Sequence, residues 1–289
     1  MMQRPRLLTQ RLVCGDCIEV MAGMSDGSVD LVFGSPPYED CRTYGIGFNL
    51  KGQEWVDWMV EVYRQSLRVC KGLVAFVVQG QTRKHQWSST PALLITDLYR
   101  AGVCVRQPLI YHRIGIPGGG GKEKDHAAKG GSADWLRNDY EFIVCATNGG
   151  KLPWADTLSM GHKPTCPVGG AMSKRTKEGS RANDRVYNHA FPRIANPGNV
   201  ISIGAVGGCN MGSKLCHENE APFSEKLAEF FVKSFCPPQG VVLDCFVGSG
   251  TTCAVAKQLG RGYIGIDCRQ SQIELSQRRL NERENHAGV

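Results

Sequence analysis

The chain has 289 residues, of which 42% are hydrophobic and 21% are charged, as in an ordinary globular protein. This length supplies enough core for one large α/β domain with an insert, or for two modest domains. No run approaches the ~20 apolar residues of a membrane span, and the first residues lack the apolar core of a secretory signal. We therefore expect a cytoplasmic protein without a membrane segment.

Basic residues outnumber acidic ones, with 34 Lys and Arg against 27 Asp and Glu, for a formal net charge of +7. Between residues 163 and 193 the basic residues gather with few carboxylates, as neutralisation of DNA phosphates requires. A solvated loop is the alternative interpretation of this segment. The candidate DNA-binding residues are Lys163, Lys174, Arg175, Lys177, Arg181, Arg185 and Arg193.

Thirteen cysteines are present, an odd number in a chain that is not small. Several lie in apolar runs, such as Cys104 and Cys145, which predicts reduced, buried thiols rather than disulfides. Cys14 and Cys17 form a lone C-x-x-C pair. No second pair follows at zinc-finger spacing, so we expect no metal site.

Strands alternate with amphipathic helices in the first half of the chain. The expected strands cover residues 28–38, 72–80, 105–113 and 140–147, and the expected helices cover 54–70 and 91–102. A glycine-rich stretch at 116–124 cannot support regular structure. This alternation predicts a mainly parallel sheet with helices on both faces.

The pattern changes over residues 148–216, where Gly, Pro, Ser, Asn and basic residues show no sustained periodicity. Such a composition indicates a loop-rich insert that carries recognition surface, with disorder as the alternative. The α/β pattern then resumes, with expected helices at 223–236, 251–260 and 270–284 and expected strands at 241–250 and 262–267. We therefore divide the chain into residues 1–147, an insert over 148–216, and residues 217–289, which complete the first domain.

The strongest local signal is a strand that ends at Asp244 and passes through Gly248 and Gly250 into a helix near Thr251. Nineteen residues after Gly248, a second strand ends at Asp267, which is the spacing at which a carboxylate meets ribose hydroxyls. Asp267 could otherwise only cap the following helix.

The spacing of these glycines is not that of a dinucleotide fingerprint, and a P-loop lysine is missing. An adenosine that carries an amino-acid tail fits better than a pyrophosphate, because Asp244 could neutralise the ammonium group of that tail. S-adenosylmethionine meets these requirements.

A second signal follows the strand over residues 29–33, whose carboxyl end delivers Ser35, Pro36, Pro37 and Tyr38. Open α/β sheets bind ligands at that end of their strands. Consecutive prolines remove N–H donors, and Tyr38 offers a flat face for a planar base. An ordinary Pro-Pro turn beside a core tyrosine is the alternative.

Together these segments resemble the amino-group DNA methyltransferases of the β arrangement, in which the Pro-Pro-Tyr motif precedes the recognition region and the glycine motif comes last. The resemblance covers nearly the whole chain and implies a Rossmann-like S-adenosylmethionine-dependent methyltransferase fold, with residues 1–147 catalytic, 148–216 recognising the target and 217–289 binding the cofactor. It rests on Gly15-Asp16, Ser35-Pro36-Pro37-Tyr38, the segment from His217 to Leu227, Asp244 to Thr252, and Gly265-Ile266-Asp267.

By position, the resemblance implies that Ser35, Pro36, Pro37 and Tyr38 surround the target base. It implies cofactor contacts for Asp16, Phe223, Lys226, Asp244, Phe246, Gly248, Ser249, Gly250, Thr251, Thr252 and Asp267, with Asp16 near the adenine and Asp267 on the ribose. The chain departs from the family where Cys245 and Ser224 stand in place of the more usual prolines, which predicts less rigid loops at these two points.

The activity that this resemblance implies is methylation of an exocyclic base amine in duplex DNA by base flipping and direct in-line transfer. None of the fourteen prolines precedes a cysteine, so the Pro-Cys nucleophile of carbon-5 cytosine methylation is missing. Serine at position 35 favours cytosine N4, and adenine N6 is the alternative. An enzyme acting on RNA amines and a catalytically idle nucleic-acid-binding module are further alternatives. A separate cognate restriction nuclease is a candidate partner, and monomer and homodimer both stay open.

Overall fold

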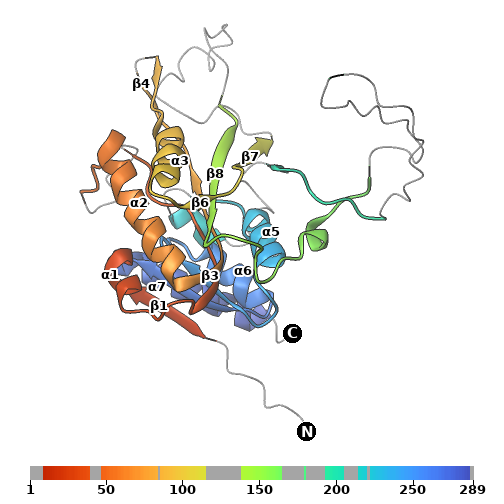
Figure 1. Cartoon of the computed structure of the whole chain (residues 1–289). Coiled ribbons are helices and arrows are strands. Elements are labelled where there is room, and N and C mark those ends of the chain that lie inside the picture. Colours follow the sequence, from red (N-terminus) through yellow and green to blue (C-terminus); the bar gives the residue numbers. More distant parts are fainter. Residues whose placement is uncertain are drawn as a thin grey trace, which may run out of the picture.

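The computed structural model describes residues 9–39, 47–83, 85–114, 138–164, 179, 193–204, 214–219 and 222–286. A nine-stranded sheet runs through the centre of the molecule, with helices on both sides (Figure 1). Within the described ranges, no helix is both long and apolar enough to cross a bilayer.

Five neighbouring strands of the sheet are parallel. In spatial order they are β1 (Gln10–Cys14), β11 (Gly262–Asp267), β10 (Val241–Asp244), β2 (Val29–Gly34) and β3 (Cys70–Val78). The remaining strands extend the sheet beyond β3. They are β8 (Tyr140–Thr147), antiparallel to β3; β7 (Leu109–Ile114), antiparallel to β8; β9 (Val200–Gly204), parallel to β7; and β6 (Cys104–Val105), paired with β8. The expected mainly parallel sheet is confirmed, and among its described strands β8 alone runs in the opposite direction, antiparallel to β3, β6 and β7.

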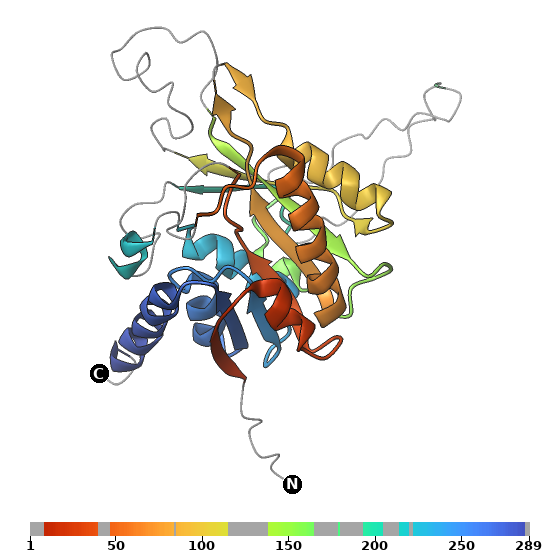
Figure 2. The same ribbon diagram turned by 90° about the vertical axis from the view of Figure 1, so that its left-hand side faces the viewer.

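Helices cover both faces of the sheet (Figures 1 and 2), and the described part of the chain supplies three to each. One layer contains α1 (Cys17–Ala22), α2 (Gly52–Val69) and α3 (Thr90–Arg100), and the other contains α5 (Glu225–Phe235), α6 (Thr251–Gln258) and α7 (Gln270–His286). Short elements complete the described chain: the 3-10 helices η1 (Thr157–Met160) and η3 (Lys214–Glu218), and the hairpin of β4 (Thr82–Arg83) and β5 (Gln86–Trp87). The five helices expected from the sequence begin and end within two residues of the observed bounds.

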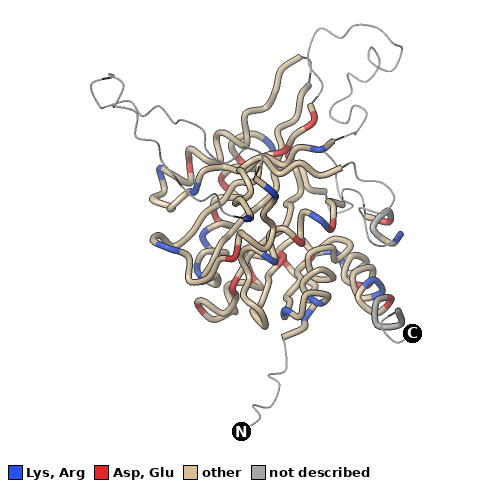
Figure 3. Tube along the Cα trace, turned by 90° about the vertical axis from the view of Figure 1, so that its right-hand side faces the viewer, with Lys and Arg blue, Asp and Glu red and all other residues tan. Residues whose placement is uncertain are grey.

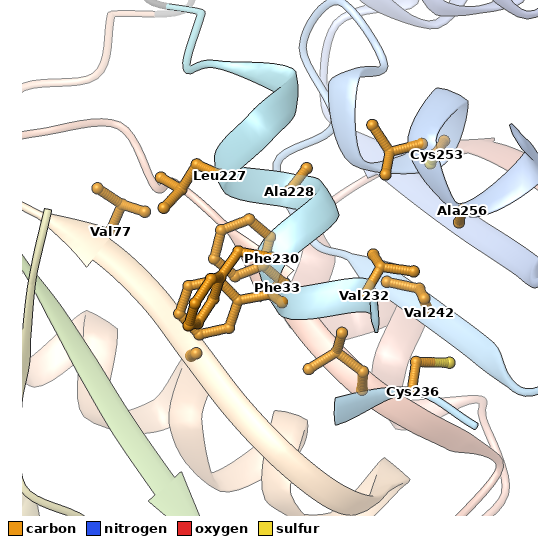
Figure 4. Close-up of a cluster of buried hydrophobic side chains, with 14 of the residues drawn as sticks. Phe33, Val77, Leu227, Ala228, Phe230, Val232, Cys236, Val242, Cys253 and Ala256 are labelled. Atoms are coloured by element: carbon orange, nitrogen blue, oxygen red, sulfur yellow. The ribbon is translucent and has the colours of Figure 1, made fainter. Parts of the chain in front are cut away.

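Burial on both faces explains why the central strands are apolar throughout. Along β2, Leu31 and Phe33 belong to the core under α5, whereas Val32 lies in the core under α2. The Phe33 ring stacks on Phe231 of α5 with the centroids 4.3 Å apart (Figure 4 shows Phe33 beneath this helix). This packing fixes α5 above the carboxyl half of β2, where the candidate site begins.

Two strands of the central sheet, and the short hairpin of β4 and β5, were not expected from the sequence. Strand β1 pairs with β11 from Gln10 to Cys14, and β9 lies inside the segment interpreted as a loop-rich insert. Ile201 and Ile203 of β9 are buried while their neighbours are not, so a short alternating pattern marks this strand in the sequence. The described part of the segment 148–216 therefore contributes β9 to the sheet, and the role of the segment in target recognition stays a prediction.

The cysteine side chains that the structure describes are free thiols. Cys145 is buried as expected, but the same expectation was wrong for Cys104, which is exposed because β6 is a two-residue strand at the margin of the sheet. Cys17 is buried and Cys14 exposed, and the described residues contain no group of three or more potential metal ligands.

Candidate functional site

The parallel strands bring the residues of both sequence motifs to one edge of the sheet. Asp267 ends β11, Asp244 ends β10, and Ser35 follows β2, so these residues come from three neighbouring strands. Gly34 lies so close to Asp244 that a Cβ there would overlap the carboxylate. Ligands of open α/β sheets bind at this edge, and the two motifs, more than 200 residues apart in sequence, form one site there.

Two glycines shape the turn between β10 and α6. Gly248 has φ 49° and Gly250 has φ 79°, a left-handed region that side chains disfavour. A Cβ on Gly248 would lie 2.7 Å from Asn219 Nδ2, and the Ser276 hydroxyl donates to the Gly248 carbonyl at 2.7 Å. Glycine is required at this turn both by backbone conformation and by close packing.

Asp267 braces the same turn. Its Oδ2 accepts from the backbone N–H of Gly248 at 3.1 Å, and its Oδ1 accepts from the backbone N–H of Arg269 at 3.0 Å. The residue is 8% exposed. Each carboxylate oxygen has a second lone pair, so Asp267 can brace the turn and still accept from ligand hydroxyls. The capping role and the ribose role that the sequence left as alternatives are compatible.

Asp244 is the most deeply buried carboxylate of this edge, with 1% exposure. Its Oδ1 accepts from the backbone N–H of Phe246 at 3.0 Å. Burial raises the pKa of Asp244 to about 7, against the lowering effect of the Phe246 N–H and of the Thr252 hydroxyl, and the charge of Asp267 raises it further. Such a carboxylate favours a cationic ligand, whose charge would offset the cost of burying the ionised form.

Arg279 on α7 was missed by the sequence analysis. Its side chain is fully buried and donates to the Ser249 carbonyl, to the Ser249 hydroxyl at 3.1 Å and to the Thr251 hydroxyl at 2.9 Å, while pairing with Glu225 at 2.7 Å. The hydroxyls of Ser249 and Thr251 are thus bonded to an arginine beneath the turn. Their contact with a cofactor stays a prediction. The sequence signal for its burial was that Arg279 lies one helical turn after Leu275, on the buried face of the helix.

The other expected cofactor residues lie around this edge with different exposures. Asp16 is the exposed N-cap of α1, with Oδ1 accepting from the backbone N–H of Ile18 at 2.8 Å. Phe246 is half-buried, and its ring contacts Trp58 and Phe76 with centroids 5.7 and 5.8 Å away.

At the start of α5, the Phe223 ring meets Phe33 edge-on at 5.5 Å, which places it beside the strand that carries Ser35. Lys226 is exposed on this helix. Ser224, at a position where the resembled family has proline, caps α5 by accepting from the backbone N–H of Lys226 at 3.2 Å.

The Ser-Pro-Pro-Tyr turn is fixed by hydrogen bonds from several elements. Ser35 Oγ lies 3.2 Å from the Val77 carbonyl oxygen and 3.4 Å from the Tyr38 hydroxyl. The Pro37 carbonyl accepts from the indole N–H of Trp55 on α2 at 2.8 Å. Pro36 is buried, and Ser35 and Tyr38 are half-buried.

Glu39 directly follows the motif and was also missed. It is 4% exposed, and its carboxylate accepts from the backbone N–H of Gly52 at 2.8 Å, from the Thr90 hydroxyl at 2.8 Å and from the Ser88 hydroxyl. These bonds connect the turn to the beginnings of α2 and α3. Glu39 therefore fixes the direction in which the turn leaves β2.

Another acidic residue, Glu141 on β8, contacts the turn through Tyr38. The Tyr38 hydroxyl is hydrogen bonded to the Glu141 carboxylate, and Arg113 on β7 pairs with it at 3.3 Å. Burial raises the pKa of Glu141, while the charge of Arg113 and the bond from Tyr38 act to lower it. The sequence showed Glu141 only as a polar residue in an apolar strand.

Two of the candidate DNA-binding residues are described, and both are exposed. Lys163 and Arg193 lie close together because His162 and Ala195 form an antiparallel bridge, with N–H to carbonyl distances of 3.1 and 2.9 Å. Basic and acidic residues are interspersed along the described chain in Figure 3. The other five candidates lie outside the described residues: Lys174, Arg175, Lys177, Arg181 and Arg185.

Comparison with curated proteins finds several relatives that align over most of the chain. Type II methyltransferase M.HpaI of Haemophilus parainfluenzae is 27% identical over 95% of this chain and 75% of its own length. Orphan methyltransferase M.BamHII of Bacillus amyloliquefaciens is 28% identical over 89% of this chain and 90% of its own. DNA adenine methyltransferase YhdJ of Escherichia coli K12 is 27% identical over 93% and 82%, respectively.

Solved structures share the fold. PvuII DNA methyltransferase, named as cytosine-N4-specific, matches with a TM-score of 0.67 and 18% identity over 94% of this chain and 87% of its own. A putative DNA modification methylase from Thermus thermophilus, complexed with S-adenosyl-L-methionine, matches with a TM-score of 0.57 and 22% identity over 95% and 94%. Residues 29–278 also match the N6/N4 family model, described as DNA methylase. Because this match spans most of the chain, the protein belongs to the N6/N4 family of DNA methylases.

Proposed function

We propose that this DNA methylase transfers a methyl group from S-adenosylmethionine to the exocyclic N4 amine of cytosine in duplex DNA, by base flipping and direct in-line transfer. One observation carries the proposal: the Ser35 turn and the Asp244 carboxylate lie at the ends of the neighbouring parallel strands β2 and β10. A base on Ser35 and a cofactor on Asp244 would be adjacent.

The residues at the ends of β10 and β11 fit S-adenosylmethionine, the methyl donor of this family. When bound, this cofactor supplies an electrophilic sulfonium methyl. Asp244, buried and with its pKa raised, suits the ammonium of the methionine part, and Asp267 suits the ribose hydroxyls. The turn through Gly248 and Gly250 lets a ligand approach the backbone closely.

On the base side, the amine is a poor nucleophile because its lone pair is delocalised into the ring. Ser35 Oγ and the Pro36 carbonyl would accept the amine protons and favour the geometry in which the lone pair points at the methyl group. Tyr38 would stack on the flipped base. Its hydroxyl lies 3.4 Å from Ser35 Oγ, so the stacking ring of Tyr38 and the acceptor oxygen of Ser35 are side by side.

Ser35 favours cytosine over adenine, since in the resembled family serine at this position accompanies N4 methylation. The similar PvuII structure is named cytosine-N4-specific, whereas the relative YhdJ is named an adenine methyltransferase. The test is digestion and mass spectrometry of DNA methylated by the purified protein. Detection of N4-methylcytosine supports the proposal. Detection of N6-methyladenine would refute the choice of cytosine and support only the transfer of a methyl group to a base amine.

DNA binding by the basic residues between 163 and 193 is part of the proposal, with Lys163 and Arg193 exposed on adjacent segments. Relatives are named Type II methyltransferases, which supports a role beside a separate restriction nuclease, although M.BamHII is named an orphan. Labelled methyl transfer to duplex DNA, compared with RNA, distinguishes this activity from RNA methylation and from an idle binding module.

A further inference from the structure

We propose that Glu141, acting through Tyr38, orients Ser35 toward the base amine and receives the proton that the amine loses on methylation. This inference rests on the proposed function, because it assumes that Ser35 faces an exocyclic amine. It assigns a role to the buried ion pair of Glu141 and Arg113, which has no part in the proposed binding of cofactor, base or DNA.

A continuous chain of polar groups runs from the end of β2, through Tyr38, to Glu141 on β8 and Arg113 on β7. Ser35 Oγ lies 3.4 Å from the Tyr38 hydroxyl, which is hydrogen bonded to the Glu141 carboxylate. Glu141 in turn pairs with Arg113 NH1 at 3.3 Å. The chain is shielded, since the Glu141 and Arg113 side chains are only 13% and 16% exposed.

The acceptors in this chain fix the direction of its hydrogens. Glu141 as a carboxylate can only accept, so the Tyr38 hydroxyl donates to it. The phenol oxygen can then accept from Ser35 Oγ, and the other neighbour of Ser35 Oγ, the Val77 carbonyl at 3.2 Å, is also an acceptor. Ser35 therefore directs its one hydrogen into the protein, and its lone pairs are left for the amine.

The groups around Glu141 suit a proton acceptor. Arg113 is its cationic partner, and Tyr111, its cross-strand neighbour on β7, has its pKa raised to about 12 by burial and by the charge of Glu141, so this tyrosine stays neutral. Toward β3 lies the neutral Gln79, which donates to the Tyr140 carbonyl. Burial makes Glu141 more basic than an exposed carboxylate, while Arg113 keeps a charged form available.

The transfer balances without any further reactant. The amine nitrogen forms the N–C bond with its lone pair while the C–S bond breaks and sulfur keeps the bonding electrons. The amine proton passes to Ser35 Oγ, the Ser35 hydrogen to the Tyr38 oxygen, and the Tyr38 hydrogen to Glu141. The products are the methylated amine, a neutral thioether and a protonated Glu141, which then loses its proton to solvent.

The test compares Glu141→Gln with Tyr38→Phe in single-turnover methylation at saturating cofactor. Glutamine keeps an oxygen that accepts from Tyr38 but takes up no proton, and phenylalanine keeps the stacking ring without the hydroxyl. We expect both variants to slow transfer by about 10²-fold, the lower end of general-base contributions, with cofactor affinity unchanged. The wild-type rate should fall as pH falls and Glu141 is protonated, and Glu141→Gln should lose that dependence.

Asp139→Asn is the matched control, because it removes a carboxylate two residues away that is 41% exposed and pairs with His112 at 3.7 Å. It should keep the wild-type rate and pH profile. Infrared titration of the unliganded protein gives a readout apart from activity, and it is done in an Asp244→Asn background because Asp244 is a second carboxyl with a raised pKa. There, a protonated carboxyl band that titrates above the usual glutamate range should be present, and adding Glu141→Gln should remove it. A Glu141→Gln protein with wild-type rate and pH profile would overturn the inference and leave the proposed function intact. A wild-type protein that methylates no base amine would overturn both.

Discussion

Replacing Asp244 by asparagine should stabilise the unliganded protein and abolish tight cofactor binding. In the folded protein the pKa of Asp244 is raised to about 7 by burial, against an ordinary value of 3.8. Between these two pH values the folded state holds a proton that the unfolded state has lost, so stability falls as pH rises through this window. Above pH 7 the full pKa difference of about three units between the folded and unfolded states applies, and the buried charge lowers the free energy of unfolding by about 4 kcal/mol.

Asparagine carries no charge to bury, and its oxygen can still accept from the Phe246 N–H that now bonds Asp244. We therefore expect a gain in the free energy of unfolding of up to about 4 kcal/mol at pH 8 and a smaller gain at pH 5. Urea denaturation of unliganded wild type and variant at both pH values measures it. Asp26→Asn, which removes a carboxylate that is 80% exposed, is the control and should give no such pH-dependent gain.

Cofactor affinity should change in the opposite sense. The ammonium of the cofactor binds the ionised carboxylate, so wild-type affinity should weaken about tenfold for each pH unit below 7. Asp244→Asn should bind weakly at every pH, without this dependence. Titration calorimetry from pH 5.5 to 8 tests this. A folded variant with wild-type affinity would show that Asp244 is not the ammonium partner. A folded variant with no pH-dependent gain in stability would show that the charge of Asp244 is not costly to bury.

The remaining predictions concern the other parts of the site. Asp267→Ala should weaken cofactor binding by roughly 1.5–3 kcal/mol through loss of a charged hydrogen-bond acceptor, and unchanged affinity in a folded variant would remove Asp267 from the site. Arg279→Met should lower the free energy of unfolding by about 3–5 kcal/mol, because it leaves Glu225 without its buried partner, and adding Glu225→Gln should recover part of this loss in denaturation. Tyr38→Ala and Ser35→Ala should both slow single-turnover methylation. A mismatched target lowers the cost of flipping the base and should partly rescue only Tyr38→Ala, which has lost the stacking ring. Wild-type rates in both variants would show that the turn has only a structural role. When alanine replaces Lys174, Arg175 and Lys177, the logarithmic salt dependence of DNA binding should flatten by about 0.9 for each phosphate that is no longer neutralised, and an unchanged slope would mark a solvated loop.

The sequence predicted those features of the site that depend on local spacing. A strand, a glycine turn and a helix in succession place Asp244 at a strand end, and the next strand does the same for Asp267. Periodicity also located α2, α3, α5, α6 and α7, because each has one face on the sheet, but it missed α1, whose six residues are too few to show a period. These features need only neighbouring residues and the rule that parallel strands end together.

The residues that fix the site were not predicted, because their partners are distant in sequence. Glu39 bonds to the beginnings of α2 and α3, up to 51 residues away, and Arg279 bonds Ser249 and Glu225 from 30 and 54 residues away. A buried charge has no periodic signature, since its compensation is set by tertiary packing. Ser249 and Thr251 show the same limit: their hydroxyls were expected at the cofactor, and the structure shows them bonded to Arg279.

Strand direction decides what Glu141 can do. The alternation of strands and helices predicts parallel neighbours, but β8 runs antiparallel to β3, pairing Val78 with Phe142 and Val74 with Ala146. Its first residues therefore lie at the carboxyl end of β3, next to the turn that carries Tyr38. In a parallel arrangement Glu141 would lie at the opposite edge of the sheet, about 25 Å away at ~3.3 Å per residue. The contact between Glu141 and Tyr38 is thus a consequence of topology, and the reversal of this one strand is what brings a buried carboxylate to the base side of the site.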